Sequence, residues 1–361
     1  MLYHLLYPLR ETSIIFNLLR YITFRVAAAA VTSLLISFII GPTVINILRK
    51  KHIGDPVRED SPEHHKIKKG TPSMGGIIMV IAFTISTLLW ADLGNLYIWL
   101  ALLGTLFSAA MGFWDDYLKI VKRHRKGMLG REKLVGQIIL GLVVGFIFYL
   151  NPPMESVRTA TELPFIKNIT IDFSIFYILW IAFVITGSSN SINLTDGLDG
   201  LAVGLSAIVA AVFVITAYIV GRWDFSNYLN ILYLPGAGEL SIFAAAVGGV
   251  CLGFLWYNSF PASVFMGDTG ALSLGAAFGT VAVLLKKEFL LLIVGGVFVV
   301  ETLSVIIQVI SFQTTGKRVF RMTPIHHSFE LKGDPEPKIV ARFWIIGILF
   351  ALLGLATFKV R

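Results

Sequence analysis

The most regular feature of the chain is a series of long apolar runs separated by short polar segments. The runs are roughly 18 to 25 residues long, which is the length that an α-helix needs to cross the hydrocarbon core of a bilayer. They predict about ten transmembrane helices. The expected spans are 22–48, 72–91, 97–118, 134–151, 173–190, 198–220, 239–257, 267–285, 288–311 and 340–358. We therefore expect an all-α, polytopic integral membrane protein in which residues 1–361 form a single domain.

The composition supports this interpretation. Of the 361 residues, 56% are hydrophobic and 14% are charged, and the mean hydropathy is +0.78, which excludes an ordinary soluble domain. The net charge of +8 does not indicate a nucleic-acid partner, because Lys and Arg are concentrated in a few loops between the apolar runs. The single cysteine, Cys251, lies inside an apolar run, so the sequence predicts no cysteine-based metal cluster.

Basic residues are concentrated in the loops that follow the first, third and ninth expected spans. These residues are Arg49, Lys50, Lys51, Arg58, Lys66, Lys68 and Lys69, then Lys119, Lys122, Arg123, Arg125, Lys126, Arg131 and Lys133, and finally Lys317, Arg318, Arg321, Lys332 and Lys338. By the positive-inside rule these loops are cytoplasmic and both termini are periplasmic. Lys286 and Lys287, between the eighth and ninth spans, go against this orientation, although Glu288 partly offsets their charge.

This orientation places every chemically rich loop on the cytoplasmic side. These loops are 49–71, 115–133, 190–200, 258–270 and 312–339, whereas 151–172 and 221–238 are expected to be plain connectors. A polar cleft at one membrane surface favours an enzyme that joins a water-soluble substrate to a lipid. A transporter is the alternative from another class: it would use Asp115, Asp196, Asp199 and Asp268 as an ion path and would move its substrate without covalent change.

The segment Asn193–Gly200 is acidic, interrupted by glycine and set between two apolar runs. Asn193, Asp196 and Asp199 recur every three residues, so on a helical turn they would share one face. Carboxylates beside hydrocarbon are costly unless they meet a cation or a polar substrate. We therefore expect the other acidic and basic loops to converge on this segment.

The third span ends in two adjacent carboxylates, Asp115 and Asp116. Adjacent side chains on a helix point about 100° apart, so one can face the bundle interior while the other orients a neighbour. A carboxylate there can bind Mg²⁺ or act as a base on a lipid phosphate. The pair also suits a solvated helix end that is neutralised by Lys119.

The loop between the seventh and eighth spans places Asp268 at an expected helix start, where free N–H groups favour phosphate. As a hard oxygen ligand, Asp268 can share a Mg²⁺ ion with Asp115, Asp196 or Asp199. Phe265, in the same loop, can stack on a base. A helix cap beside an ordinary interfacial aromatic residue is the alternative interpretation.

Two further loops and three isolated polar residues are candidates. His326 and His327 do not have the spacing of a helical zinc site, so phosphate contact is favoured over metal binding, with solvated surface histidines as the alternative. The segment 66–76 is not a Walker A loop, but Lys68, Lys69 and Ser73 can hold phosphates, unless the lysines only anchor the membrane surface. Polar groups in or beside apolar spans are either functional or interhelical hydrogen-bond partners, and here they are Asn190, Glu301 and Gln308.

Five motifs in order carry a resemblance to a known family. They are Lys-Lys-Gly-Thr-Pro-Ser-Met-Gly-Gly, Trp-Asp-Asp-Tyr, Asn-Leu-Thr-Asp-Gly-Leu-Asp-Gly, Phe-Met-Gly-Asp-Thr-Gly and Pro-Ile-His-His. As a set, from about Phe24 to Arg361, the chain resembles the polyprenyl-phosphate N-acetylhexosamine-1-phosphate transferases. The first and last motifs look most like the branch that uses UDP-N-acetylmuramoyl-pentapeptide.

The resemblance implies a multi-pass enzyme of the bacterial cytoplasmic (inner) membrane with ten transmembrane helices, a cytoplasmic-facing cleft and a homodimeric state. It implies transfer of phospho-N-acetylmuramoyl-pentapeptide from UDP to undecaprenyl phosphate with Mg²⁺, forming lipid I and UMP for peptidoglycan. By motif, Asp115 and Asp116 match the catalytic carboxylates, Asp268 the Mg²⁺ ligand, and His326 and His327 the loop histidines. The substrate-binding positions implied are Lys68, Ser73, Lys119, Lys133, Asn190, Asn193, Asp196, Asp199, Asn258, Phe265 and Gln308.

Two points depart from a simple match or stay open. Ser328 occupies a position where the family often has a third histidine, which leaves the role of that position undefined. The transfer can occur in one step, or in two steps through an aspartyl-phosphate on Asp268 or Asp115. The alternative within the same enzyme class is a sister transferase that uses UDP-N-acetylglucosamine, against which the Pro-Ile-His-His motif argues.

Overall fold

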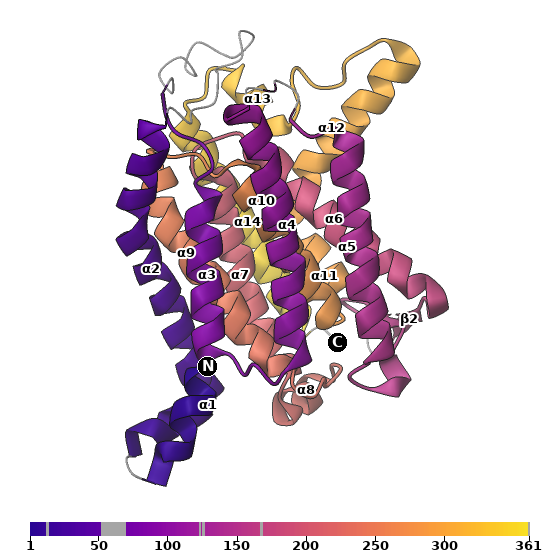
Figure 1. The fold of residues 1–361 in the computed structure, drawn as a ribbon. Coiled ribbons are helices and arrows are strands. Elements are labelled where there is room, and N and C mark those ends of the chain that lie inside the picture. The colour runs from indigo at the N-terminus through magenta and orange to yellow at the C-terminus, as the bar shows by residue number, and fades with distance from the viewer. Residues whose placement is uncertain (12–13, 52–69, 123, 125–126, 167–168, 360–361) are drawn as a thin grey trace.

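The long helices lie side by side and form a bundle (Figure 1). The computed structural model describes the chain except for residues 12–13, 52–69, 123, 125–126, 167–168 and 360–361. The long helices are α2 (Ile22–Lys50), α3 (Gly76–Trp90), α4 (Leu96–Ile120), α5 (Gly130–Leu150), α6 (Tyr177–Thr195), α7 (Leu201–Val220), α9 (Leu240–Asn258), α10 (Gly267–Leu284), α12 (Gly296–Thr315) and α14 (Glu336–Ala356). The short elements are α1 (Leu2–Leu6), α8 (Trp223–Leu229), α11 (Glu288–Val294), α13 (Ile325–Glu330), strands β1 (Ala160–Glu162) and β2 (Thr170–Asp172), and the 3-10 turns η1 (Tyr7–Glu11), η2 (Ile14–Arg20), η4 (Glu155–Val157), η5 (Ser174–Phe176) and η6 (Ala237–Glu239).

The prediction of a polytopic helical membrane protein is confirmed, with two changes to the spans. Over the described residues, nine helices are long and apolar enough to cross a membrane. The span expected at 72–91 is α3, whose 15 residues give about 22 Å at 1.5 Å per residue, less than a hydrocarbon core of about 30 Å. The span expected at 288–311 is broken at Gly295, which separates α11 from α12.

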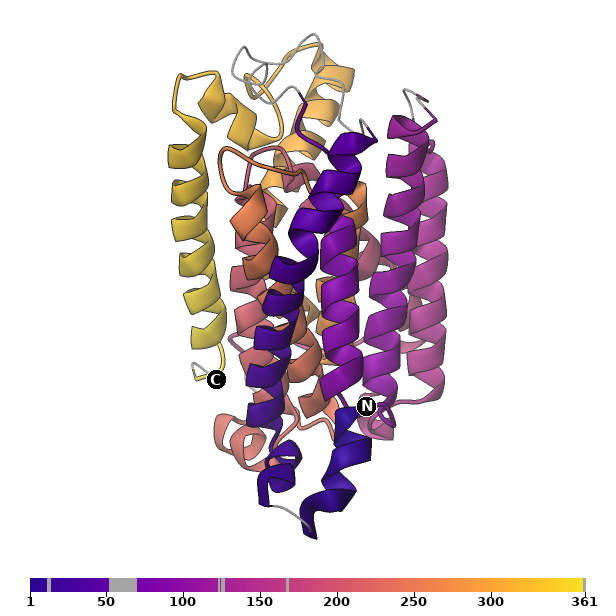
Figure 2. The ribbon, with the colours of Figure 1, turned by 60° about the vertical axis from the view of Figure 1, so that its left-hand side comes forward.

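Helix α10 is the central helix of the bundle. In its most apolar stretch 89% of the residues are buried, compared with 28% for α2 and 33% for α5, α12 and α14. Figure 2 shows α14 at one edge of the bundle and α5 toward the opposite edge. The outer helices expose large apolar side chains, such as Ile39 on α2 and Leu349 on α14. A helix that is apolar all round and buried is therefore surrounded by helices whose outer faces suit lipid.

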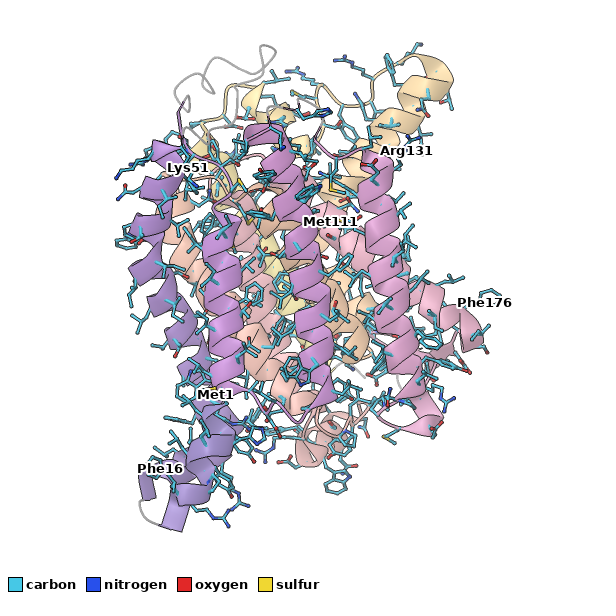
Figure 3. All side chains as sticks on the ribbon, viewed as in Figure 1. Met1, Phe16, Lys51, Met111, Arg131 and Phe176 are labelled. Atoms are coloured by element: carbon cyan, nitrogen blue, oxygen red, sulfur yellow. The ribbon has the colours of Figure 1, made fainter. Side chains whose placement is uncertain are left out.

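The polar loops and the termini lie at opposite ends of the bundle. The end of α4, the start of α5 and the segment that contains α13 lie at one end, and both termini and α8 lie at the other (Figure 1). Figure 3 likewise places Lys51 and Arg131 at the former end and Met1 and Phe16 at the latter. This arrangement agrees with the prediction that the chemically rich loops share one side of the membrane and the termini lie on the other. The assignment of the polar end to the cytoplasm stays a prediction.

The connector at 151–172 corrects two expectations. It contains an antiparallel hairpin, with Ala160 opposite Asp172 and Glu162 opposite Thr170, so the fold is not entirely α-helical. It is also not a plain connector, because Glu162 forms a buried ion pair with Lys287. Lys286 is completely buried and donates a hydrogen bond of 2.9 Å to the carbonyl oxygen of Arg158. Both lysines therefore interact inside the protein, which explains why they conflicted with a rule for exposed basic loops.

Candidate active site

Backbone hydrogen bonds join the segment before α3 to the segment before α10. The N–H of Phe265 donates to the carbonyl of Pro72, and the N–H of Gly75 donates to the carbonyl of Phe265, both at 2.8 Å. Gly76 continues the pairing with a 2.8 Å bond to the carbonyl of Met266. Two segments almost two hundred residues apart in sequence are thus fixed side by side, and the start of α10 is held in place.

The end of α4 packs directly on the first turn of α10. Asp116 accepts hydrogen bonds from the backbone N–H groups of Asp268, at 3.1 Å, and Thr269, at 2.9 Å, and from the Thr269 hydroxyl at 2.6 Å. These bonds satisfy N–H groups that a helix start leaves without partners inside the helix. Gly112 permits the approach, because a Cβ there would lie 2.2 Å from the carbonyl oxygen of Asp268.

Asp115, Asp268 and two lysines form a compact charged cluster. Lys133 Nζ lies 2.6 Å from Asp115 Oδ2 and 2.5 Å from Asp268 Oδ2. Lys119 Nζ lies 2.5 Å from Asp115 Oδ2 and 3.2 Å from Asp268 Oδ2. The N–H of Met128 adds a 2.6 Å hydrogen bond to Asp115 Oδ1. Two cations between two largely buried carboxylates compensate charges that would be very unfavourable alone.

The three carboxylates meet the basic requirement for a divalent cation. One oxygen from each of Asp115, Asp116 and Asp268 lies within 4.8 Å of the others. Hard oxygen donors are what Mg²⁺ prefers. The oxygens of Asp116 are already hydrogen-bonded to the first turn of α10, whereas those of Asp115 and Asp268 are held mainly by the side chains of Lys119 and Lys133. The donor set therefore fits Mg²⁺, with Asp268 and Asp115 as the ligands that the backbone of α10 does not already bind.

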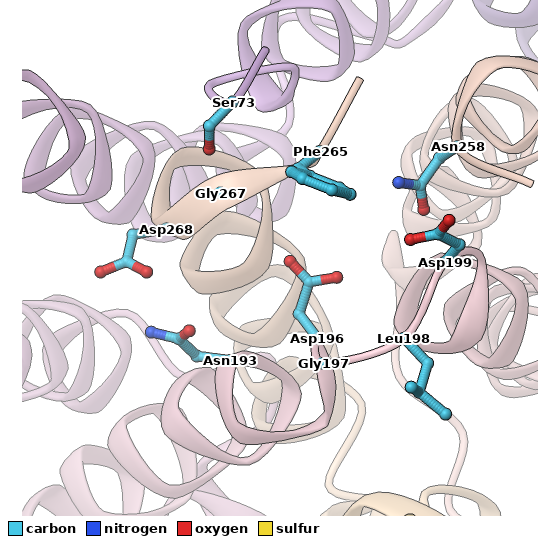
Figure 4. Close-up of a pocket in the computed structure, with 10 residues that line it drawn as sticks. All are labelled: Ser73, Asn193, Asp196, Gly197, Leu198, Asp199, Asn258, Phe265, Gly267 and Asp268. Carbon is cyan, nitrogen blue, oxygen red and sulfur yellow. The ribbon is translucent and has the colours of Figure 1, made fainter. Parts of the chain in front are cut away.

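A polar cavity of about 230 Å³ adjoins this cluster, and Asp268 belongs to both. Its lining residues are Ser73, Asn193, Asp196, Gly197, Leu198, Asp199, Asn258, Phe265, Gly267 and Asp268. Figure 4 shows Asp268 and Asn193 at one side of the cavity, Asp199 and Asn258 at the other, and Asp196 and Phe265 between them. The predicted convergence of separate loops on the 193–200 segment is thus present in the structure.

The 193–200 segment differs locally from the helical turn that was expected. Helix α6 ends at Thr195, and Asp196 is its C-cap, so of the three polar residues only Asn193 is helical. The chain then turns sharply, with Gly200 at a φ of 79°, a conformation that favours glycine. All three polar residues still reach the cavity, because the turn redirects Asp196 and Asp199 toward it.

Hydrogen bonds fix the wall formed by Asp199 and Asn258. Asp199 Oδ2 accepts from the N–H of Ala262 at 3.0 Å, and Asn258 Oδ1 accepts from the N–H of Gly200 at 3.1 Å. The N–H of Asp199 donates to Glu336 Oε1 at 2.6 Å. The loop before α10, the turn before α7 and the start of α14 are therefore joined at the cavity.

The two histidines have different surroundings, and neither is among the residues that line the cavity. His326 is completely buried, with Nδ1 3.2 Å from Glu301 Oε1. Burial lowers the pKa of His326, while Glu301 acts in the opposite direction, so the ring is neutral near pH 7. His327 Nδ1 lies 2.6 Å from Glu330 Oε2.

Five of the predicted substrate-binding residues are not among the lining residues, and two of them, Lys119 and Lys133, belong to the charged cluster instead. Asn190 donates to Gln137 Oε1 at 2.7 Å and joins α6 to α5. Gln308 donates to the carbonyl of Phe320 at 3.1 Å and holds the segment that follows α12. In this structure both therefore make contacts between parts of the protein. Lys68 lies outside the described residues.

Sequence reasoning missed several residues that build the site. Thr269 was not singled out, although a hydroxyl beside Asp268 at a helix start is a common donor. Glu336 follows Pro335 at the start of α14, which is a typical acidic first-turn position, but its contact with Asp199 depends on the tertiary fold. The hydrogen bond from the Met128 N–H could not be predicted from the sequence, because the backbone N–H is not specific to a residue type.

Comparisons with known proteins are consistent over the whole chain. Residues 98–286 match the family described as glycosyl transferase family 4. The chain is 52% identical to the phospho-N-acetylmuramoyl-pentapeptide-transferases of Citrifermentans bemidjiense and of Geobacter sp. strain M21, with 100% of each chain covered. It is 50% identical to the protein of that name from Thermodesulfovibrio yellowstonii, again with 100% of each chain covered. The family match includes the carboxylate cluster and the cavity segments except Ser73, and it ends before His326.

Proposed function

Because the chain belongs to glycosyl transferase family 4 and to its phospho-N-acetylmuramoyl-pentapeptide-transferase members, we propose that it carries out their reaction in peptidoglycan biosynthesis. It transfers phospho-N-acetylmuramoyl-pentapeptide from its UDP carrier to undecaprenyl phosphate, forming lipid I and UMP. The observation that carries this proposal is the double position of Asp268, which both lines the polar cavity and belongs to the cluster with Asp115 and two lysines. A donor bound in the cavity would thus present its diphosphate to the charged cluster.

The reaction exchanges one phosphorus–oxygen bond for another. An oxygen of undecaprenyl phosphate forms a bond to the sugar-linked phosphorus of the donor. The bond from that phosphorus to the bridging oxygen breaks, and UMP leaves with the electron pair. Both reactants are anionic, so the enzyme must compensate negative charge before their phosphates can approach.

The residues of the cluster supply this compensation. Lys119 and Lys133 contact Asp115 and Asp268 here and are close enough to contact phosphate oxygens when substrates bind. Asp115 orients the lipid phosphate or accepts its proton. Asp116 acts on the cluster through the backbone of α10, since its oxygens accept hydrogen bonds from residues 268 and 269. Phe265 and Asp196, which both line the cavity, would contact the uracil side of the donor.

A Mg²⁺ ion held by Asp268, with Asp115 as a further oxygen ligand, would supply charge neutralisation to the diphosphate. A direct transfer and a two-step transfer through an aspartyl-phosphate both use these same residues. They are distinguished by incubating the enzyme with donor and labelled UMP in the absence of lipid. Label enters the donor only by the two-step route.

The proposal also covers the orientation of the enzyme, the membrane in which it lies and its oligomeric state. The polar end of the bundle faces the cytoplasm, the membrane is the bacterial inner membrane, and the enzyme is a homodimer. The relatives and the distribution of basic residues in the loops support the first two points. The homodimer comes from the family resemblance, and native mass spectrometry of the detergent-solubilised protein tests it.

The deciding experiment uses purified protein in detergent with UDP-N-acetylmuramoyl-pentapeptide, undecaprenyl phosphate and Mg²⁺. We expect UMP and lipid I to form together, as followed by mass spectrometry, and both to disappear when EDTA is added. UMP release only from UDP-N-acetylglucosamine would assign the chain to the sister transferases. Absence of product from both donors would contradict the proposal.

A further inference from the structure

Glu301 and His326 form a buried polar pair outside the cavity. Glu301 lies on α12, shortly after the break at Gly295, and His326 lies on α13. Both side chains are 0% exposed, and the separation between His326 Nδ1 and Glu301 Oε1 is 3.2 Å. Within the described part of the chain, neither the carboxylate oxygens nor the ring nitrogens form a hydrogen bond, so the 3.2 Å ion-pair contact is the polar contact that joins the two side chains. An isolated carboxylate is very unfavourable at such a site, so the imidazole is its essential partner.

This contact determines the orientation of the histidine ring. A carboxylate oxygen accepts a hydrogen bond from a ring N–H, so the contact favours the tautomer with the proton on Nδ1. Nε2 then points away from α12. A Cβ atom placed on Gly197 would lie 2.3 Å from His326 Nε2 and 3.0 Å from Cε1. The ring therefore occupies the space that any other residue at position 197 would need for its side chain.

Gly197 is part of the cavity wall, between Asp196 and Leu198, which also line it. The later part of the same turn is held by the hydrogen bonds from Asp199 to Glu336 and from Gly200 to Asn258. The ring of His326 supports the earlier part. Contacts thus run continuously from α12 through α13 to the turn between α6 and α7.

We propose that Glu301 is a positioning residue, which fixes the ring of His326 against Gly197 and thereby holds the Asp196–Leu198 part of the cavity wall in place for the uridine end of the donor. The inference depends on the proposed function, because it takes the cavity as the donor site. Neither Glu301 nor His326 needs to touch substrate in this role. Loss of the pair should weaken nucleotide binding more than it slows chemistry.

The first experiment compares Glu301→Leu, Glu301→Gln and wild type with Mg²⁺ present. UMP affinity is measured by calorimetry, and KM and kcat with the full donor. We expect Glu301→Leu to weaken UMP binding and raise KM about tenfold, with kcat within about twofold of wild type. Glu301→Gln keeps an oxygen acceptor for Nδ1–H and should recover most of the affinity. Thr302→Val is the matched control, because Thr302 bonds Ser191 and the backbone of its own helix rather than α13, and it should bind UMP as wild type does.

A second experiment tests the contact itself. Gly197→Ala forces the ring or the turn to move, so we expect it to weaken UMP binding about tenfold in the wild-type background. A His326→Ala background removes the clash with that ring and leaves only His327 Nε2, at 3.3 Å, close to the added Cβ. Adding Gly197→Ala there should change affinity less than about twofold. Loss of the thermal transition would show that Glu301→Leu does not fold. In that case the comparison of Gly197→Ala in the two backgrounds tests the inference.

Three results would overturn the inference. They are wild-type UMP affinity in folded Glu301→Leu, an equal effect of Gly197→Ala in both backgrounds, and a fall in kcat of His326→Ala with UMP affinity unchanged. Failure of the proposed function looks different. In that case wild type itself neither binds UMP nor releases it from the donor, and the positioning role falls with it.

Discussion

The carboxylate of Asp116 on α4 accepts a hydrogen bond of 3.1 Å from the backbone N–H of Asp268 on α10. One aspartate thus sets the position of the other through the backbone rather than through a shared ligand. The two adjacent acidic residues at the end of α4 consequently have different roles. Asp115 joins the charged cluster, whereas Asp116 builds the helix start that presents Asp268.

We expect Asp116→Asn to lower both stability and turnover. The amide keeps one acceptor oxygen, but it loses the charge that strengthens these bonds, and hydrogen bonds to charged groups contribute about 1.5 to 3 kcal/mol. The unfolding temperature in detergent, measured by tryptophan fluorescence, checks this. Asp224→Asn is the control, because Asp224 forms an exposed ion pair with Arg222 at the other end of the bundle. Equal unfolding temperatures for the two variants would contradict the capping role of Asp116.

Asp115→Asn and Asp268→Asn should each reduce turnover at least about a thousandfold while the protein still folds. Their oxygens contact both lysines and provide the negative charge that would bind Mg²⁺, and an amide does not replace it. UMP release in the presence of undecaprenyl phosphate measures the loss, and size-exclusion elution establishes that the fold is retained. Near-normal turnover in either variant would remove that residue from the mechanism.

Lys133→Met should lower both the turnover and the Mg²⁺ concentration needed for half-maximal rate. Turnover should fall about a hundredfold, because a cation near the transferred phosphate is lost. The Mg²⁺ concentration for half-maximal rate should also fall, because Lys133 contacts the oxygens of Asp115 and Asp268 that would bind the ion. A Mg²⁺ titration of the rate gives both values. An unchanged or higher half-saturating concentration would show that Lys133 does not compete with the metal.

Gly112→Ala should destabilise the protein and lower its activity together. The added Cβ would lie 2.2 Å from the backbone oxygen of Asp268, so α4 and α10 must separate, and overpacking of this kind usually costs about 1 to 3 kcal/mol. Gly130→Ala is the matched control, since among the described residues no atom outside its own stretch of helix lies within 4 Å of a Cβ at that position. We expect its unfolding temperature to equal or exceed that of wild type. A harmless Gly112→Ala would contradict the close packing at the site.

Lys286 should make stability depend on pH. Desolvation by burial lowers the pKa of Lys286 from 10.5 to about 7, against the attraction of Glu288 and Asp172. Between about pH 7 and pH 10 the unfolded chain binds a proton that the folded protein does not, so stability should rise with pH across this window. The limit is about 1.4 kcal/mol per pH unit. Unfolding temperatures of wild type and Lys286→Met, measured from pH 7 to pH 9, check this. The unfolding temperature of wild type should rise relative to that of the variant as the pH increases. Parallel curves would show that Lys286 keeps its ordinary pKa in the fold.

The sequence alone determined the class of the fold and most of the candidate site. Apolar runs of membrane length report directly on burial in lipid, so the helices could be located without tertiary information. The acidic and amide residues at the ends of these runs could also be recognised, because polar groups are rare there and need a reason. Asp115, Asp268 and Asn193 were identified in this way, and so was the convergence of their loops.

Only the tertiary structure decided which of these residues contact each other. Hydrogen bonds between α4 and α10 distinguish Asp116 from Asp115, although the two are identical in type and adjacent in sequence. Lys286 and Lys287 are buried against the hairpin. They are therefore not among the exposed basic residues to which the positive-inside rule applies. The contact of His326 with Gly197 joins segments more than a hundred residues apart. Local patterns encode what one segment prefers, whereas pairing between distant segments depends on the packing of the whole bundle.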